Sequence, residues 1–69
     1  MPESRSVIWE LYKGAERLTC ELRNHGDHGV EIALLRDGAW FHSQIFVNEI
    51  RARNHAEDAR RTAEQEGWS

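Results

Sequence analysis

Three residues that could do chemistry lie together in one short segment, Asn24 to Gly29. The segment reads NHGDHG and brings His25, Asp27 and His28 close together. Two imidazoles and a carboxylate could bind zinc, but a zinc site uses three or four ligands in tetrahedral geometry, and no second ligand cluster is close in the sequence. The glycines, Asn24 and Asp27 are typical of a turn. We therefore predict a hairpin turn without a metal, and keep a small metalloprotein using residues 25–28 as a third hypothesis.

Other candidate catalytic residues fail on geometry. Cys20 shares a strand face with Leu18 and Leu22, and apolar burial makes a thiol inert by raising its pKa. His42 and Ser43 are adjacent on a predicted strand, so their side chains point to opposite faces and cannot form a base–nucleophile pair. No glycine-rich phosphate loop opens a helix. We predict no enzymatic activity and no cofactor.

The elements that position these residues follow from the hydrophobic pattern. Apolar and polar residues alternate in three segments, which is typical of strands buried on one face, and a fourth strand follows the last of them. We expect Val7, Trp9 and Leu11 on one face of the first strand, and a two-residue hairpin turn at residues 37–38, because Asp-Gly accepts positive φ. The predicted strands are residues 7–12, 17–23, 30–36 and 39–46.

The pattern changes to a helical period at Asn48. This residue is a good N-cap, and Gly67 fits the left-handed position after the last turn, so we expect Trp68 to fold back toward Ala63. The predicted helix spans residues 49–66. Its small residues form one stripe, which we expect to pack on the sheet: Ala52, Ala56, Ala59 and Ala63.

The predicted fold class is α+β. We expect one domain over residues 1–69, a four-stranded antiparallel β-meander with one C-terminal helix packed on one face. The other face must meet solvent or a partner. In the fourth strand, alternation sends Trp40 and Phe46 to one side and Phe41 and Ile45 to the other. We expect Phe46 to point inward, which leaves Phe41 and Ile45 partly exposed.

The face without a helix holds the candidate binding residues. Three glutamates lie at the centres of three neighbouring predicted strands, where like charges opposite one another are destabilising, and a cluster kept at such a cost favours a binding role. The alternative is that Arg17, Arg23 and Arg36 pair with these carboxylates and the cluster is only structural. Apolar groups ringed by charge are typical of protein-binding patches. The predicted partner-binding residues are Glu10, Tyr12, Glu21, Glu31, Phe41, Ile45 and Ile50.

Composition narrows the environment and the partners. The chain of 69 residues holds 12 acidic and 9 basic residues, a net charge of -3. Nucleic-acid binding usually needs an electropositive surface, so direct binding to nucleic acid is disfavoured. The single Cys20 cannot form an internal disulfide, and no apolar run is long enough to span a bilayer. We expect a cytoplasmic protein without a membrane partner, either monomeric or weakly dimeric.

Two resemblances add to these expectations. From about Trp9 to Trp68, the segments RLTCELRNHG and GVEIALLRDGAW and the Ala-rich helix ending in EGW resemble small uncharacterised bacterial ββββα proteins. This resemblance implies the fold and no activity. Asn48 stands where those proteins carry Thr or Ser as the cap, and Ala and His55 replace their aliphatic helix residues. By size and acidity alone, the chain also looks like a phage anti-CRISPR-type inhibitor.

These observations favour a non-enzymatic protein-binding module. The second resemblance implies an acidic surface that engages a basic, DNA-binding partner, such as a CRISPR effector subunit. The alternative is a β-sheet nucleic-acid-binding protein, since strands can read a groove. The two hypotheses differ in whether the face without a helix exposes carboxylates or basic side chains.

Overall fold

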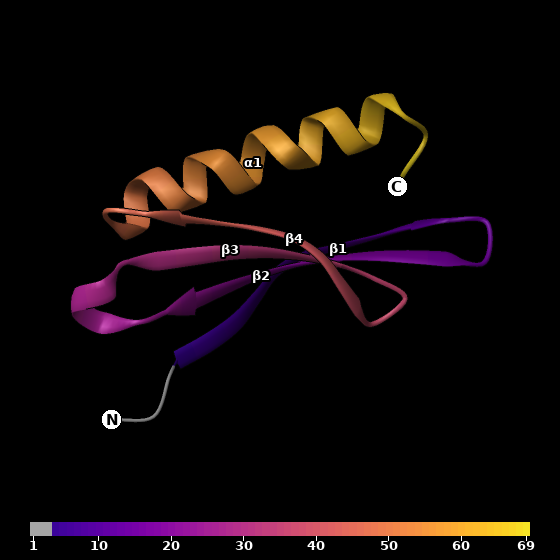
Figure 1. Cartoon of the computed structure of the whole chain (residues 1–69). Coiled ribbons are helices and arrows are strands. Elements are labelled where there is room, and N and C mark those ends of the chain that lie inside the picture. Colours follow the sequence, from indigo (N-terminus) through magenta and orange to yellow (C-terminus); the bar gives the residue numbers. More distant parts are fainter. Residues whose placement is uncertain (1–3) are drawn as a thin grey trace.

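The fold is a four-stranded antiparallel sheet followed by one helix, as predicted. The computed structural model describes residues 4–69, so residues 1–3 of the predicted domain lie outside the described part. Figure 1 shows α1 on one side of the sheet. The strands are ordered β1-β2-β3-β4, and each pairs with the next in the chain. The elements are β1 (Ser4–Lys13), β2 (Glu16–Asn24), the short 3-10 turn η1 (Gly26–His28), β3 (Val30–Arg36), β4 (Ala39–Phe46) and α1 (Glu49–Gln65).

The predicted boundaries agree closely with the observed ones. β3 and β4 begin and end where the alternation predicts. β1 begins at Ser4 rather than at residue 7, and β2 extends one residue further at each end than predicted. α1 ends at Gln65, because Glu66 is the C-cap and has left helical geometry.

The hairpin between β3 and β4 turns at Asp37 and Gly38. Their φ angles are 53° and 84°, the positive values that a two-residue turn of this kind requires. The Asp37 side chain also accepts a hydrogen bond from the backbone N–H of Arg17 at 2.9 Å. The predicted turn is confirmed, and it is tied to β2 as well as to its own strands.

Both ends of α1 are capped as predicted. The Asn48 side chain accepts a hydrogen bond from the Arg51 N–H at 2.9 Å. At the other end Gly67 has φ 101°, and the Trp68 N–H donates to the Ala63 carbonyl at 3.1 Å. This is the Schellman arrangement, and it turns the buried Trp68 ring back toward the sheet.

The core lies between the sheet and the alanine stripe of α1. Ala52, Ala56 and Ala63 are buried, and Ala59 is partly buried against the same cluster. Trp9 spans the two layers, and its indole N–H donates to the Ala56 carbonyl at 2.9 Å. Cys20 is fully buried in the core, as predicted. This burial raises the pKa of its thiol to about 12. The cluster consists of Trp9, Leu11, Leu18, Cys20, Leu22, Val30, Ile32, Ala52, Ala56, Ala63 and Trp68.

A bulge in β1 overturns one prediction about side-chain direction. Val7 pairs with Glu21 and Trp9 pairs with Cys20, so Ile8 is an extra residue. An extra residue reverses the alternation. Ile8 therefore packs against the core, whereas Val7 is exposed on the opposite face. The prediction that Val7 shares the inner face with Trp9 and Leu11 is wrong.

A second bulge does the same in β4. Leu34 pairs with His42 and Leu35 with Trp40, which makes Phe41 the extra residue. Phe46 packs against the core and Ile45 is exposed, as predicted. Trp40 pairs with Leu35 on the face away from α1, so its predicted inward direction is wrong. Phe41 turns to the helix side, so its predicted place beside the glutamates is also wrong.

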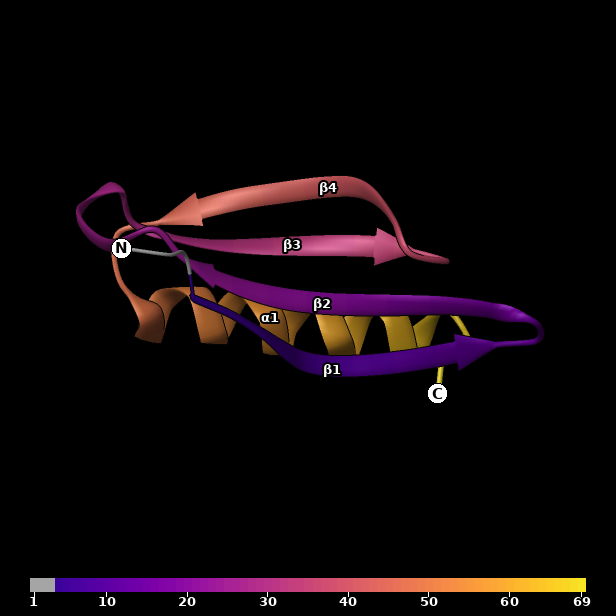
Figure 2. The same cartoon turned by 90° about the horizontal axis from the view of Figure 1, so that it is seen from below.

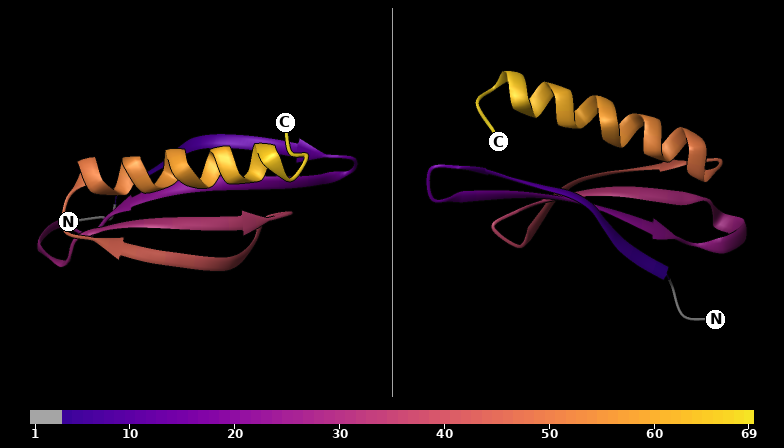
Figure 3. Two further views of the ribbon diagram at one scale, coloured as in Figure 1. Left: turned by 90° about the horizontal axis from the view of Figure 1, so that it is seen from above. Right: turned by 180° about the vertical axis from the view of Figure 1, so that it is seen from behind.

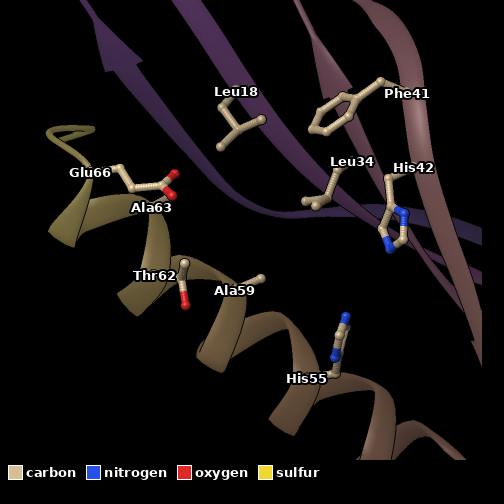
Figure 4. Close-up of a pocket in the computed structure, with 9 residues that line it drawn as sticks. All are labelled: Leu18, Leu34, Phe41, His42, His55, Ala59, Thr62, Ala63 and Glu66. Carbon is tan, nitrogen blue, oxygen red and sulfur yellow. The ribbon is translucent and has the colours of Figure 1, made fainter.

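The course of α1 leaves part of β4 uncovered. The helix starts directly after β4 and runs across the sheet, so that its end lies beside β1, where Lys13 donates to the Glu66 carbonyl at 2.8 Å. Figures 2 and 3 show α1 crossing the sheet obliquely, so that its last turns lie away from the start of β4. Alanine side chains are too short to fill the space that remains. A hollow of about 330 Å³ lies there, with Phe41 and His42 on the sheet side and Ala59 and Thr62 on the helix side (Figure 4).

Leucine substitutions in the alanine stripe test this packing. Ala56→Leu should lower the free energy of unfolding by about 1–3 kcal/mol, because the added atoms meet a filled core and push the helix away from Trp9. Ala59→Leu is the matched control, since its side chain would enter the hollow and should cost much less. Urea unfolding of both variants measures the difference. Equal losses would mean that the hollow is not open beside Ala59.

Candidate functional site

The face of the sheet away from α1 is the candidate site, and we call it the open face. It is seen from below in Figure 2, with β1 and β4 at its two edges. Strand pairing arranges its side chains in rows that cross the sheet, because directly paired residues share a face. One row runs Arg5, Arg23, Glu31 and Ile45; the next Val7, Glu21, Ala33 and Ser43; the third Glu10, Thr19, Leu35 and Trp40; and Tyr12 pairs with Arg17.

The three glutamates of the open face lie in three different rows. Glu10 is opposite Thr19, Glu21 is opposite Val7 and Ala33, and Glu31 is opposite Arg23. The expectation that like charges stand directly opposite one another is therefore wrong. The observed register places polar, apolar or basic residues opposite them, so no two of these carboxylates are directly opposed.

Hydroxyl groups hold the Glu10 carboxylate. The Tyr12 hydroxyl donates to one oxygen at 2.7 Å, and the Thr19 hydroxyl donates to the other at 3.1 Å. The pKa of Glu10 is held below its ordinary value, mainly by the hydrogen bond from Tyr12. The hydrogen bond from Thr19 and the positive charge of Arg17 lower it further. The hydrogen bond between Tyr12 and Glu10 also raises the pKa of Tyr12. Glu10 and Tyr12 thus form one fixed unit at the β1 edge.

Cationic or imidazole groups hold the other two carboxylates. Arg23 donates twice to one oxygen of Glu21, at 3.0 and 3.2 Å, and Arg5 approaches the same oxygen at 4.0 Å. The Nε2 atom of His25 lies 2.8 Å from Glu31. Only 14% of the side chain is exposed in both Glu21 and Glu31. The open face is therefore a network of paired charges rather than a bare acidic surface.

Large apolar side chains flank this network. Trp40 is 58% exposed and Ile45 59% exposed on β4, while Val7 is 58% exposed and Tyr12 is exposed on β1. Trp40 stands directly opposite Leu35, so the two form an apolar corner beside the buried Thr19. The sequence pattern did not assign Trp40 or Val7 to this face, because each precedes a bulge. In the sequence, the only signal for these bulges is that Val7 and Trp40 are each followed by a second apolar residue, Ile8 and Phe41.

Two of the predicted binding residues lie elsewhere. Phe41 is at the bulge of β4 and lines the hollow on the helix side. Ile50 is 74% exposed in the first turn of α1, which packs on the other face of the sheet. The structure brings together the remaining five predicted residues, Glu10, Tyr12, Glu21, Glu31 and Ile45.

The segment from Asn24 to Gly29 forms a turn, as predicted. The Asn24 side chain accepts a hydrogen bond from the Gly26 N–H at 2.8 Å. Gly29 has φ 103°, and a Cβ there would lie only 2.7 Å from the Phe46 carbonyl oxygen, so this position needs glycine. His25 turns to Glu31, while Asp27 and His28 are exposed. Across residues 4–69 no three His, Cys, Asp or Glu side chains are grouped to hold a metal ion.

Comparison of the chain with protein-family models, with curated proteins and with solved structures finds no match. In the part of the chain that the structure describes, no helix has both the length and the apolar character to cross a membrane.

The contact between His25 and Glu31 predicts a pH dependence. This hydrogen bond is the main cause that lowers the pKa of Glu31 below its ordinary 4.5. A lowered pKa stabilises the fold above the ordinary value, and this stabilisation is lost as the pH falls through the lowered pKa. The gap in unfolding free energy between wild type and Glu31→Gln should therefore narrow from neutral to strongly acid pH.

Urea unfolding across that pH range measures the gap. Asp27→Asn removes an exposed carboxylate from the turn that carries His25 and controls for the loss of one charge. A gap that stays constant, or that narrows equally for Asp27→Asn, would contradict the assignment of this stabilisation to the His25–Glu31 contact.

Proposed function

We propose that the protein is a non-enzymatic protein-binding module that engages its partner with the open face. One observation carries this proposal. The single helix covers one face only, and the other face exposes Trp40, Ile45 and Val7 around a network of paired charges. Apolar anchors next to ordered polar groups are typical of protein interfaces, in which tryptophan is enriched among residues that dominate the affinity.

The pairing of charges on the open face indicates what kind of partner surface it can bind. Glu10, Glu21 and Glu31 already have partners within the chain, and Arg5, Arg17 and Arg23 lie on the same face. Three acidic and three basic side chains give this face a balanced charge, which supports recognition through apolar anchors and matched polar groups. A strongly basic partner, an inhibitor of the anti-CRISPR type and a cytoplasmic location stay predictions of the sequence.

The corner made by Trp40 and Leu35 is the strongest anchor. Trp40 is large, more than half exposed and fixed in a strand, so binding a partner there buries apolar area at a small loss of conformational freedom. Leu35 lies opposite it and is partly buried, so it extends the apolar surface toward the centre of the face. A partner with a shallow apolar pocket and polar rim fits this arrangement.

Paired pull-downs from a lysate test the proposal. Trp40→Ala should lose proteins that wild type retains, whereas Ile50→Ala should retain them, because Ile50 is also apolar and exposed, at 74% against 58%, but lies on α1. For a purified partner, calorimetry should show a loss of about 2 kcal/mol or more for Trp40→Ala, the size expected at a dominant interface residue.

Two outcomes would contradict the proposal. Retention of every partner by Trp40→Ala would show that the open face is only a solvated surface. Binding of oligonucleotides with a steep salt dependence, lost on Arg17→Ala or Arg23→Ala, would favour the nucleic-acid alternative. A steep salt dependence toward a protein partner, weakened by Glu10→Gln, would instead support the contact between an acidic surface and a basic partner.

A further inference from the structure

The two edges of the sheet differ in how they are protected. An exposed edge strand offers unpaired N–H and C=O groups, and proteins usually guard it with charged side chains, bulges or a covering segment. β1 has all three kinds of protection. Arg5, Glu10 and Lys13 are its charged side chains, Ile8 forms its bulge, and Ser69 is the covering residue. The backbone of Ser69 exchanges hydrogen bonds of 2.7 and 2.9 Å with that of Tyr12. The β1 edge is therefore protected.

The β4 edge lacks most of this protection. Its sequence, AWFHSQIF, has no Asp, Glu, Lys, Arg or Pro. Within residues 4–69, no segment pairs with the outer side of β4. Its large side chains Trp40, Phe41 and Ile45 are each more than half exposed. The bulge at Phe41 interrupts the strand near its start, and the pairing with β3 is regular from His42 to Phe46. This stretch is a free, uncharged template for another strand.

We propose that β4 pairs with β4 of a second copy of this chain. The two strands would run antiparallel about a two-fold axis perpendicular to the sheet and join two sheets into one of eight strands. Both helices then lie on the same face. The inference does not depend on the proposed open-face function, because it concerns the strand edge and the association of identical chains.

A second copy fits this edge better than a different protein does. A different strand-adding partner is usually selected by pockets for its side chains or by complementary charges, and β4 has no charge to select with. Two uncharged edges meet without repulsion, although the chain has a net charge of -3. An edge with these properties favours pairing with another strand. The β4 strand of a second copy is always available for such pairing, and most oligomers are built from identical chains.

Alternation requires that one β4 residue stand opposite its own copy, and we choose Ser43 because this register also brings the exposed apolar side chains together. Ser43 and Ile45 lie on the open face, and His42, Gln44 and Phe46 lie on the helix face. An axis at Ser43 places Ser43 opposite itself and His42 opposite Gln44, so that like faces meet. It also brings Ile45 beside the bulge residues Trp40 and Phe41 of the second copy, and the reverse. These side chains then lie along the seam between the two copies, while Val7 and the β1 side of the open face stay uncovered.

Sedimentation equilibrium over a wide range of protein concentration tests the proposal. Wild type should reach twice the mass of the chain and dissociate on dilution. Ile45→Lys should keep the mass of one chain, because a charge at the edge blocks strand pairing. Val7→Lys is the matched control: Val7 is equally exposed, at 58% against 59%, and lies on the same face but on β1, so this variant should still dimerise.

Cross-linking checks the register and does not need the lysine variant to fold. Opposite Cα atoms in an antiparallel pair are about 4.5 or 5.5 Å apart, within the roughly 4.4–6.8 Å that a disulfide spans. Ser43→Cys should form a disulfide-linked dimer on mild oxidation, and Ser6→Cys, on the β1 edge, should not. The buried Cys20 does not interfere.

A wild-type mass of one chain at every concentration together with no Ser43→Cys cross-link would overturn the proposal. A dimer that persists in Ile45→Lys, or that is lost in Val7→Lys, would also overturn it and place the contact elsewhere. Testing Val7→Lys in the pull-down separates the two proposals, because Val7 lies on the open face but outside the dimer contact. If that variant loses its partner while it stays dimeric, the open-face function stands independently of the dimer.

Discussion

The close approach of α1 to the sheet is the constraint on which the rest of the structure depends. Three alanines on the helix are fully or almost fully buried, so the helix backbone lies near the strands. Trp9 uses this nearness: its ring fills the space between the layers, and its N–H reaches the Ala56 carbonyl at 2.9 Å. A larger residue at Ala56 would separate the two groups and leave the buried indole N–H without its partner, which is costly.

This constraint also sets what the helix cannot cover. α1 starts after β4 and must end near β1, where Trp68 folds under the capped last turn and Arg36 lies over its ring at 5.7 Å. A single helix on this course covers one face and leaves the start of β4, its outer edge and the open face to solvent or partners. The exposed apolar side chains of β4 lie along these uncovered surfaces, so the packing of the core determines where binding can occur.

Most of the fold could be predicted from the sequence because its signals are local. Asp37 and Gly38 take positive φ, Asn48 caps the Arg51 N–H, and Gly67 ends the helix, each through contacts within a few residues. The two bulges could not be placed, because an extra residue depends on which of two adjacent apolar side chains fills the core. Ile8 and Phe41 took the helix side, and that choice moved Val7 and Trp40 to the open face.

The candidate site could be predicted only in part, for the same reason. Alternation correctly assigned Glu10, Glu21, Glu31 and Ile45 to the open face. It could not show that the glutamates lie in different rows, because pairing between strands depends on register and not on the position within each strand. Nor could it show that His25, on the loop, turns back to Glu31 at 2.8 Å. The change from an acidic cluster to a paired network follows from these long-range contacts.

Amide hydrogen exchange, followed residue by residue at low and high protein concentration, tests most directly whether this packing leaves β4 open to a second strand. The amides of β4 that point away from β3 should exchange quickly in dilute protein and slowly in concentrated protein, because strand pairing protects them. The outward amides of β1 should exchange at a rate that does not change with concentration. Fast exchange along β4 at every concentration, or protection that grows equally on both edges, would contradict the account.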